Sequence, residues 1–200
     1  MVLEIFGGVG SGKSLVLEIL KEQYGAEVIG MDETAHRLYE PGQPGHRAVT
    51  SLLGDEVVRP DGTLDRAALA DIVFHSTPHR RALEGIIHPL VQRMLLEKMD
   101  AAAAAGTRMV ILDVPLLFEC GMDALCDETW ALYVGREMQI SRIVARDGVT
   151  REQAEARIDS MMPTDERNAR ATHAINTDQP VEKTRQVLGQ LYRQAEKNAQ

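Results

Sequence analysis

The most constraining feature of this sequence is a glycine-rich segment of eight residues close to its N-terminus. Residues Gly7 to Ser14 read GGVGSGKS and match the pattern G-x-x-x-x-G-K-S/T. The apolar run Val2 to Phe6 precedes this segment, and apolar positions with helical spacing follow it, namely Leu15, Val16, Ile19 and Leu20. A strand, a glycine-rich loop and a helix in this order predict a phosphate-binding loop in an α/β protein.

The residue types within this segment each suit the binding of phosphate. Glycine lets the backbone curl without Cβ clashes, so successive N–H groups point at phosphate oxygens, and the positive end of the following helix adds to the attraction. Lys13 is expected to neutralise the β and γ phosphates of ATP, and the Ser14 hydroxyl to ligand Mg²⁺. The residues expected to bind the nucleotide are Gly8, Gly10, Ser11, Gly12, Lys13, Ser14 and Leu15. The alternative is a glycine-rich turn with an exposed lysine.

Short apolar runs alternate with longer helical patterns along the rest of the chain, which is typical of parallel strands joined by crossover helices. The predicted strands are Val2 to Phe6, Glu27 to Gly30, Met109 to Val114, Thr129 to Val134 and His173 to Ile175. Thr150 and Gln153 form a predicted capping box at the start of a helix. A last helix should turn Val181, Val187, Leu188, Leu191 and Tyr192 inward. We therefore predict an α/β fold with a parallel five-stranded sheet flanked by helices.

Two segments look inserted rather than part of the sheet. Residues 40–89 contain no convincing strand but several prolines and glycines, which favours helices and turns. Residues 136–170 hold seven arginines and seven acidic residues, so this segment is neutral in a chain of net charge -8. We expect a single domain over residues 1–200, with a helical insertion at about 40–89 and a helical lid over phosphates at about 136–170.

The composition excludes several classes of protein. A net charge of -8 argues against broad binding to nucleic acids or anionic membranes, since both need a basic face. We expect neither a secretory signal nor a membrane span, because the longest apolar segment, Met109 to Phe118, is far shorter than the ~20 residues that cross a bilayer. Cys120 and Cys126 are too few for a disulfide framework. A soluble cytoplasmic protein is the expectation, and its oligomeric state is left open.

Two aspartates follow predicted strands and are candidates for chemistry. Asp113 closes an apolar run, where a parallel strand would deliver its carboxylate to Mg²⁺ beside the phosphate loop. The alternatives for Asp113 are an ordinary strand-end aspartate or a helix cap. Asp32 follows Glu27 to Gly30, and a carboxylate there can orient an acceptor hydroxyl and take its proton. The alternative for Asp32 is an N-cap of the next helix.

The chain resembles the dephospho-coenzyme A kinase family, a family of P-loop kinases, along nearly its whole length. The segments that carry the resemblance are GGVGSGKS, VIGMD at Val28 to Asp32, EPG at Glu40 to Gly42, DGTLDRAAL at Asp61 to Leu69, LEGIIHPLV at Leu83 to Val91, LDVPLLFE at Leu112 to Glu119, QISRIVARDGVTREQAEARI at Gln139 to Ile158 and MPTDERNARA at Met162 to Ala171. The phosphate loop is generic, whereas the combination of LDR, HP and PLLFE is specific to the family.

The resemblance implies transfer of phosphate from ATP to the ribose 3′-hydroxyl of dephospho-coenzyme A, the last step of coenzyme A synthesis. Its implied catalytic residues are Asp32 as the base, Lys13 and Arg142. It also implies that Arg146 binds ATP and that Asp32, Arg66, His88 and Glu119 contact the substrate. Judged without the family, Arg142 and Arg146 fit a solvated helix face, and His88 fits a buried packing histidine.

Some positions depart from the family pattern, and two further functions stay open beside the implied one. The departures are Phe6, Leu15, Gly30, Met161, Thr172 and Thr177. They concern the adenine and lid contacts more than Lys13, Ser14 and Asp32. The first alternative is another small-molecule or nucleoside-monophosphate kinase on the same scaffold. The second is a nucleotide-binding regulator that has lost turnover.

Overall fold

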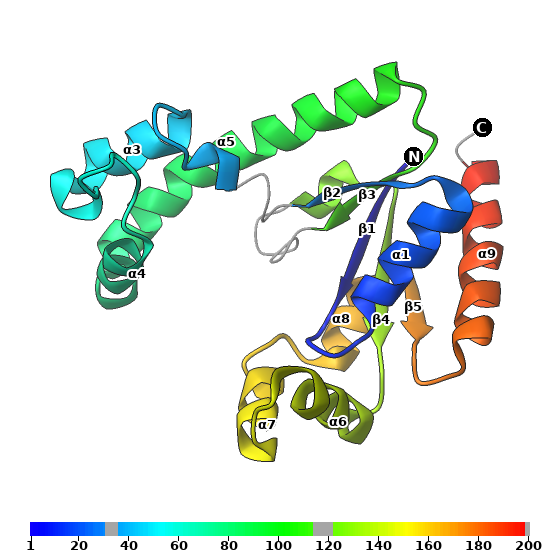
Figure 1. Cartoon of the computed structure of the whole chain (residues 1–200). Coiled ribbons are helices and arrows are strands. Elements are labelled where there is room, and N and C mark those ends of the chain that lie inside the picture. The colour runs from blue at the N-terminus through cyan, green and yellow to red at the C-terminus, as the bar shows by residue number, and fades with distance from the viewer. Residues whose placement is uncertain (31–35, 114–121, 199–200) are drawn as a thin grey trace. The chain divides into compact units, whose positions relative to one another are not determined.

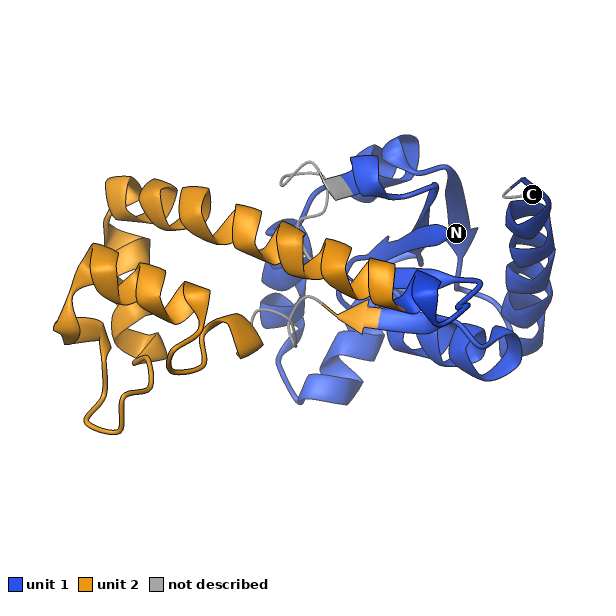
Figure 2. Cartoon of the chain, turned by 90° about the horizontal axis from the view of Figure 1, so that it is seen from above, with its two compact units in different colours: residues 1–28, 102–200 blue, residues 29–101 orange. Residues whose placement is uncertain are grey.

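A computed structural model describes residues 1–30, 36–113 and 122–198 of the chain. These residues form two compact units. The first combines Met1–Val28 with Ala102–Gln200, and the second is Ile29–Ala101 (Figure 2). The phosphate loop lies in the first unit, and the predicted insertion at 40–89 lies within the second.

Five strands form a single sheet in the order β2-β3-β1-β4-β5 (Figure 1). They are β1 (Val2–Gly7), β2 (Glu27–Gly30), β3 (Val110–Asp113), β4 (Glu128–Tyr133) and β5 (His173–Asn176). β1 pairs in parallel with β3 and β4, and β4 pairs in parallel with β5. The predicted parallel sheet is confirmed, with bounds within one residue of those expected, except that Val114 lies outside the described residues. Because β1 is central, the loop that follows it lies between the carboxyl ends of β3 and β4.

The helices of the first unit begin and end at recognisable signals. They are α1 (Lys13–Tyr24), α6 (Arg136–Asp147), α7 (Arg151–Asp159), α8 (Thr164–Arg170) and α9 (Val181–Asn198), with a short 3-10 helix at Met122–Leu125. α1 stops at Gly25, whose φ of 63° suits a glycine at a helix end. The capping box of α7 is present as predicted, because Thr150 and Gln153 each bond the other's backbone N–H.

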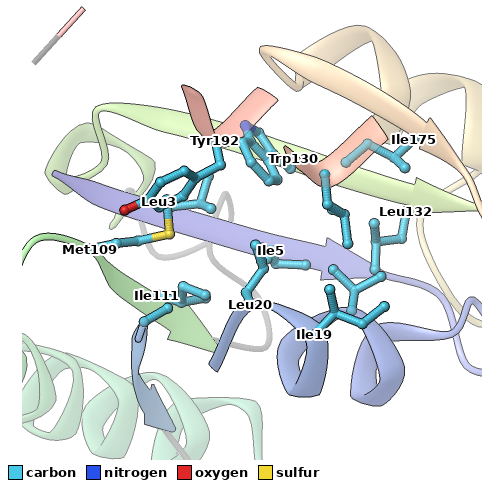
Figure 3. Close-up of a cluster of buried hydrophobic side chains, with 13 residues drawn as sticks. Leu3, Ile5, Ile19, Leu20, Met109, Ile111, Trp130, Leu132, Ile175 and Tyr192 are labelled. Carbon is cyan, nitrogen blue, oxygen red and sulfur yellow. The ribbon is translucent and has the colours of Figure 1, made fainter. Parts of the chain in front are cut away.

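The core of the first unit lies between the sheet and the pair α1 and α9 (Figure 3). Alternate residues point to this face, as the two-residue period of a strand requires: Leu3 and Ile5 of β1, Trp130 and Leu132 of β4, and Ile111 of β3 with Met109 just before that strand. α1 contributes Val16, Ile19 and Leu20, and α9 contributes Leu188 and Tyr192. Each large buried side chain stabilises the fold by roughly 1.5–3 kcal/mol, so the phosphate loop is joined to a rigid base.

Two apolar residues predicted to face the core do not. Leu15 is 36% exposed and Val181 is 40% exposed. Both lie in the first turn of a helix, where the chain has only begun to turn over the sheet. The buried stripe therefore begins one residue later in α1, at Val16, and is made in α9 chiefly by Leu188 and Tyr192.

The second unit is largely helical over its described residues. It contains α3 (Pro44–Leu53), a 3-10 turn (Asp55–Val57), α4 (Arg66–His75) and most of α5 (Thr77–Ala104). Pro44 begins α3, where the missing N–H of proline costs no hydrogen bond. Asp65 caps α4 by accepting hydrogen bonds from Ala67 N at 2.9 Å and Ala68 N at 3.2 Å. This cap fixes the start of α4 and hence the position of Arg66.

Candidate functional site

The segment Gly7 to Ser14 forms the predicted loop between β1 and α1. Gly10 and Gly12 have φ values of 80° and 86°, a region that side chains with a Cβ seldom enter. The N–H of Ser11 donates to Gly8 O at 3.0 Å, which closes the loop on itself. α1 then begins at Lys13, so the unpaired N–H groups of its first turn belong to the same loop. This backbone is the kind of anion cradle that the sequence predicts.

Lys13 and Asp113 meet at this loop. The Lys13 ammonium group donates a hydrogen bond to Asp113 Oδ1, and the two side chains form an ion pair. Asp113 is the last residue of β3, the strand beside β1, so its carboxylate reaches the loop from the neighbouring strand end. The structure thus brings together Lys13, which is predicted from the sequence to bind phosphate, and Asp113, which is predicted to bind the metal.

The side chains of Ser14 and Asp113 carry oxygen donors of the kind that magnesium prefers. Ser14, on the first turn of α1, has an exposed side chain. Hydroxyl and carboxylate oxygens are hard donors, and Mg²⁺ is usually held by one or two such protein groups together with phosphates and water. Over the described ranges, no group of three or more His, Cys, Asp or Glu side chains is placed to hold a metal alone. Ser14 and Asp113 therefore fit a site that phosphate oxygens would complete.

Three side chains from the C-terminal part of the chain hold the backbone of the loop. Gln139 Nε2, on α6, donates to Val9 O at 2.6 Å. Arg142, one helical turn further, donates to Gly10 O at 3.3 Å and to Thr177 O at 3.1 Å. Thr177 Oγ1, just after β5, donates to Ser11 O at 2.7 Å. These bonds engage the carbonyls of Val9, Gly10 and Ser11 and so hold the loop backbone in place.

Of the two arginines that the resemblance assigned to ATP, the structure brings only Arg142 to the loop. Arg146 instead donates two hydrogen bonds to Asp147, at 2.7 and 3.0 Å. Asp147 also accepts from Arg157 at 2.6 Å. The pKa of Asp147 is lower than its usual value, mainly because Asp147 accepts the hydrogen bonds from Arg146. A role of Arg146 toward ATP stays a prediction.

Sequence reasoning missed several residues that contact the loop. Gln139 and Arg167 were not singled out, and Met161 and Thr177 were noted only as departures from the family. Met161 Sδ lies 3.5 Å from the N–H of Val9, and both terminal nitrogens of Arg167 lie close to Gly8. For Gln139 a signal was available, because it shares a helix face with Arg142 three residues later. The position of Arg167 depends on how α8 packs, which no local pattern reveals.

A cavity of about 490 Å³ lies within the second unit. Its lining residues are His36, Tyr39, Glu40, Pro41, Thr63, Leu64, Arg66 and Leu69. The Arg66 guanidinium lies against the His36 ring, 2.8 Å from Nδ1 and 3.2 Å from Nε2. Burial raises the pKa of Tyr39 above its usual value. The volume falls in the range of small-molecule sites, and the lining combines apolar walls with a few polar groups.

The other predicted substrate residues divide between the described and the undescribed parts of the chain. His88 lies on α5 and is not among the residues that line the cavity. Asp32 and Glu119 lie outside the described residues. Their roles therefore stay predictions.

Comparison with known proteins gives the family of the chain. The family model described as dephospho-CoA kinase matches residues 1–183. The chain belongs to the dephospho-CoA kinase family. A curated family relative from Symbiobacterium thermophilum is 41% identical over 194 residues, which cover 97% of this chain and 81% of the relative.

Solved structures agree in fold with this family assignment. A crystal structure of a Thermus thermophilus protein superposes with a TM-score of 0.79 at 32% identity and covers 97% of both chains. A dephospho-CoA kinase from Campylobacter jejuni superposes with a TM-score of 0.72 at 24% identity, and the match covers 100% of this chain and 98% of that one. The second likeness concerns the fold alone. Together they confirm the predicted P-loop kinase architecture.

Proposed function

We propose that this chain transfers the γ-phosphoryl group of ATP to the ribose 3′-hydroxyl of dephospho-coenzyme A and so completes coenzyme A. The observation that carries the proposal is the meeting of Lys13 and Asp113 at a glycine-rich loop in a chain of this family. A cation for phosphate and a carboxylate for metal, side by side at the end of a parallel sheet, are the parts that phosphoryl transfer needs.

The loop and its cations would bind the triphosphate. Backbone N–H groups between Gly8 and Ser14 would donate to phosphate oxygens, with Lys13 and Arg142 adding positive charge. Phosphoryl transfer passes through a loose transition state, so positioning and charge stabilisation supply most of the catalysis. The hydrogen bonds from Gln139, Arg142 and Thr177 to loop carbonyls support this role, because they fix the direction of the N–H groups before any ligand binds.

Ser14 and Asp113 would hold Mg²⁺ at the same loop. The ion supplies charge that screens the phosphate oxygens during transfer. Binding of Mg-ATP would break the hydrogen bond between Lys13 and Asp113. Asp113 would then bind the metal, and Lys13 would bind phosphate. The two side chains are 27% and 32% exposed, so neither exchange requires the core to open.

The acceptor would be bound by the second unit and activated by Asp32. The cavity around Arg66 is proposed to receive part of dephospho-coenzyme A, with Leu64 and Leu69 on its apolar wall and the guanidinium for a phosphate of the substrate. His88 and Glu119 are proposed as further substrate contacts. Asp32 would orient the 3′-hydroxyl and accept its proton.

We place this reaction in the cytoplasm and expect no nucleic-acid or membrane partner. In the part of the chain that the structure describes, no helix is long and apolar enough to cross a bilayer. The net charge of -8 disfavours binding to polyanions.

A panel of acceptors tests this function against the alternatives. The purified chain is given Mg-ATP with dephospho-coenzyme A, shikimate or a nucleoside monophosphate, and ADP release is measured for each. We expect release with dephospho-coenzyme A far above the other acceptors. Preference for another acceptor would point to a different small-molecule kinase. ATP binding without ADP release from any acceptor would point to a regulator.

A further inference from the structure

Arg167 is a buried arginine in contact with the phosphate loop. It lies in the middle of α8 and is 8% exposed. A Cβ built on Gly8 would be 3.0 Å from each of its terminal nitrogens and 2.8 Å from Gln139 Nε2. The second glycine of the loop therefore leaves room for N–H donors from two helices, α6 and α8. A side chain at position 8 would have to displace the ends of Gln139 and Arg167 from the loop.

The protein supplies little to balance the charge of Arg167. Its guanidinium donates to the hydroxyl of Thr164 at 3.1 Å, and no carboxylate among the described residues forms an ion pair with it. Burial lowers the pKa of this guanidinium, and no neighbouring acid offsets that effect. A buried cation without a carboxylate destabilises a fold, whereas an apolar residue of similar volume is often neutral or stabilising there. Packing alone therefore does not explain an arginine at this position.

Neighbouring arginines show how different this environment is. Arg136 pairs with Asp159 at 2.8 Å, and Arg151 pairs with Glu137 at 2.7 Å. Arg170, three residues after Arg167 on the same helix, is exposed and pairs with Glu166. These arginines face solvent and balance acids, while Arg167 faces the loop. An anion at the loop would provide the charge that Arg167 lacks.

We propose that Arg167 binds the terminal phosphates of the nucleotide held by the Gly7 to Ser14 loop, as a third cation beside Lys13 and Arg142. Its planar guanidinium can donate two parallel hydrogen bonds to phosphate oxygens. This inference rests on the proposed function only in that the loop binds a nucleoside triphosphate, and it does not depend on the acceptor. The negative charge of bound ATP then offsets the free-energy cost of burying the guanidinium.

Binding and melting measurements on three variants test this proposal. Arg167→Met keeps the length of the side chain and removes its charge, Arg167→Lys keeps the charge without the fork, and Arg170→Met is the matched control on the same helix. ATP affinity is measured by calorimetry with Mg²⁺, and the melting temperature is measured with and without Mg-ATP.

We expect Arg167→Met to melt, without nucleotide, at or above the wild-type temperature. Its ATP affinity should fall by about tenfold or more, the scale of a lost hydrogen bond to a charged group. Arg167→Lys should lose less, and Arg170→Met should bind ATP as the wild type does. Unchanged ATP affinity in Arg167→Met would overturn the proposal, and so would failure of that variant to fold, because either result makes Arg167 a packing residue.

The outcome separates this proposal from the proposed function. If the wild type binds ATP but does not phosphorylate dephospho-coenzyme A, the acceptor assignment is wrong and the binding series for Arg167 still applies. If the wild type is active and Arg167→Met binds ATP normally, only the role of Arg167 is wrong.

Discussion

The side chains of Lys13 and Asp113 are joined by a hydrogen bond although the two residues are 100 positions apart in the chain. Lys13 begins α1 and Asp113 ends β3, so the pair links the helix that follows the phosphate loop to the end of the strand beside β1. Each side chain remains partly exposed and is thus accessible to a ligand. A partly exposed ion pair adds little to stability, about 0–1 kcal/mol, so its residues are better explained by chemistry than by folding.

Lys13→Ala should therefore abolish most activity without unfolding the protein. Removing one charge that stabilises the transferred phosphate costs about 10²-fold or more in turnover. Turnover and melting temperature should be measured together, with Lys21→Ala as the control, since Lys21 is exposed in the last turn of the same helix. Near-normal turnover in Lys13→Ala would contradict the assignment of the loop.

Arg142→Ala should raise the ATP requirement or slow transfer. The variant loses the hydrogen bonds to Gly10 O and Thr177 O as well as a positive charge near the phosphates. The loss should be about tenfold or more, since hydrogen bonds from a charged group contribute roughly 1.5–3 kcal/mol. Arg136→Ala is the matched control, because Arg136 lies on the same helix and pairs with Asp159. Equal kinetics in the two variants would contradict a role in ATP binding and support the alternative that Arg142 belongs to a solvated helix face.

Thr177→Val should loosen the loop from β5. The Thr177 side chain is buried, and its hydroxyl donates to Ser11 O at 2.7 Å. Valine has nearly the same shape and leaves that carbonyl unpaired, which should cost about 1–3 kcal/mol of stability. Chemical denaturation measures this loss, and Thr177→Ser should recover most of it because the hydroxyl is kept. A Thr177→Val protein as stable as the wild type would show that the hydrogen bond from Thr177 to Ser11 O does not contribute to stability.

Local patterns predicted the strands and the loop, because both are short-range features. The apolar run of β1 and the glycines after it need no information from the rest of the chain. Contacts that depend on tertiary packing could not be predicted from local patterns. Arg66 lines a cavity with His36, which lies 30 positions before it, and Arg167 reaches Gly8 only because α8 packs beside β4. Leu15 was misplaced because periodicity does not show where a helix first meets its sheet.

Asp32→Asn should lower turnover without affecting folding, because Asp32 is the proposed base. Asparagine keeps the shape of the side chain and caps a helix nearly as well as aspartate, but it cannot accept the proton of the hydroxyl. We expect unchanged melting and ATP affinity, with turnover lower by ~10²-fold or more. Full activity in this variant would require another base, for which Asp113 is the first candidate.

The most direct test is product formation by the wild-type chain. The protein is incubated with Mg-ATP and dephospho-coenzyme A, and the product is analysed by mass spectrometry and compared with authentic coenzyme A by chromatography. The account predicts a product with one added phosphoryl group that co-elutes with coenzyme A, formed in proportion to ADP. Dephospho-coenzyme A recovered unchanged, from a protein that is folded and binds ATP, would contradict it.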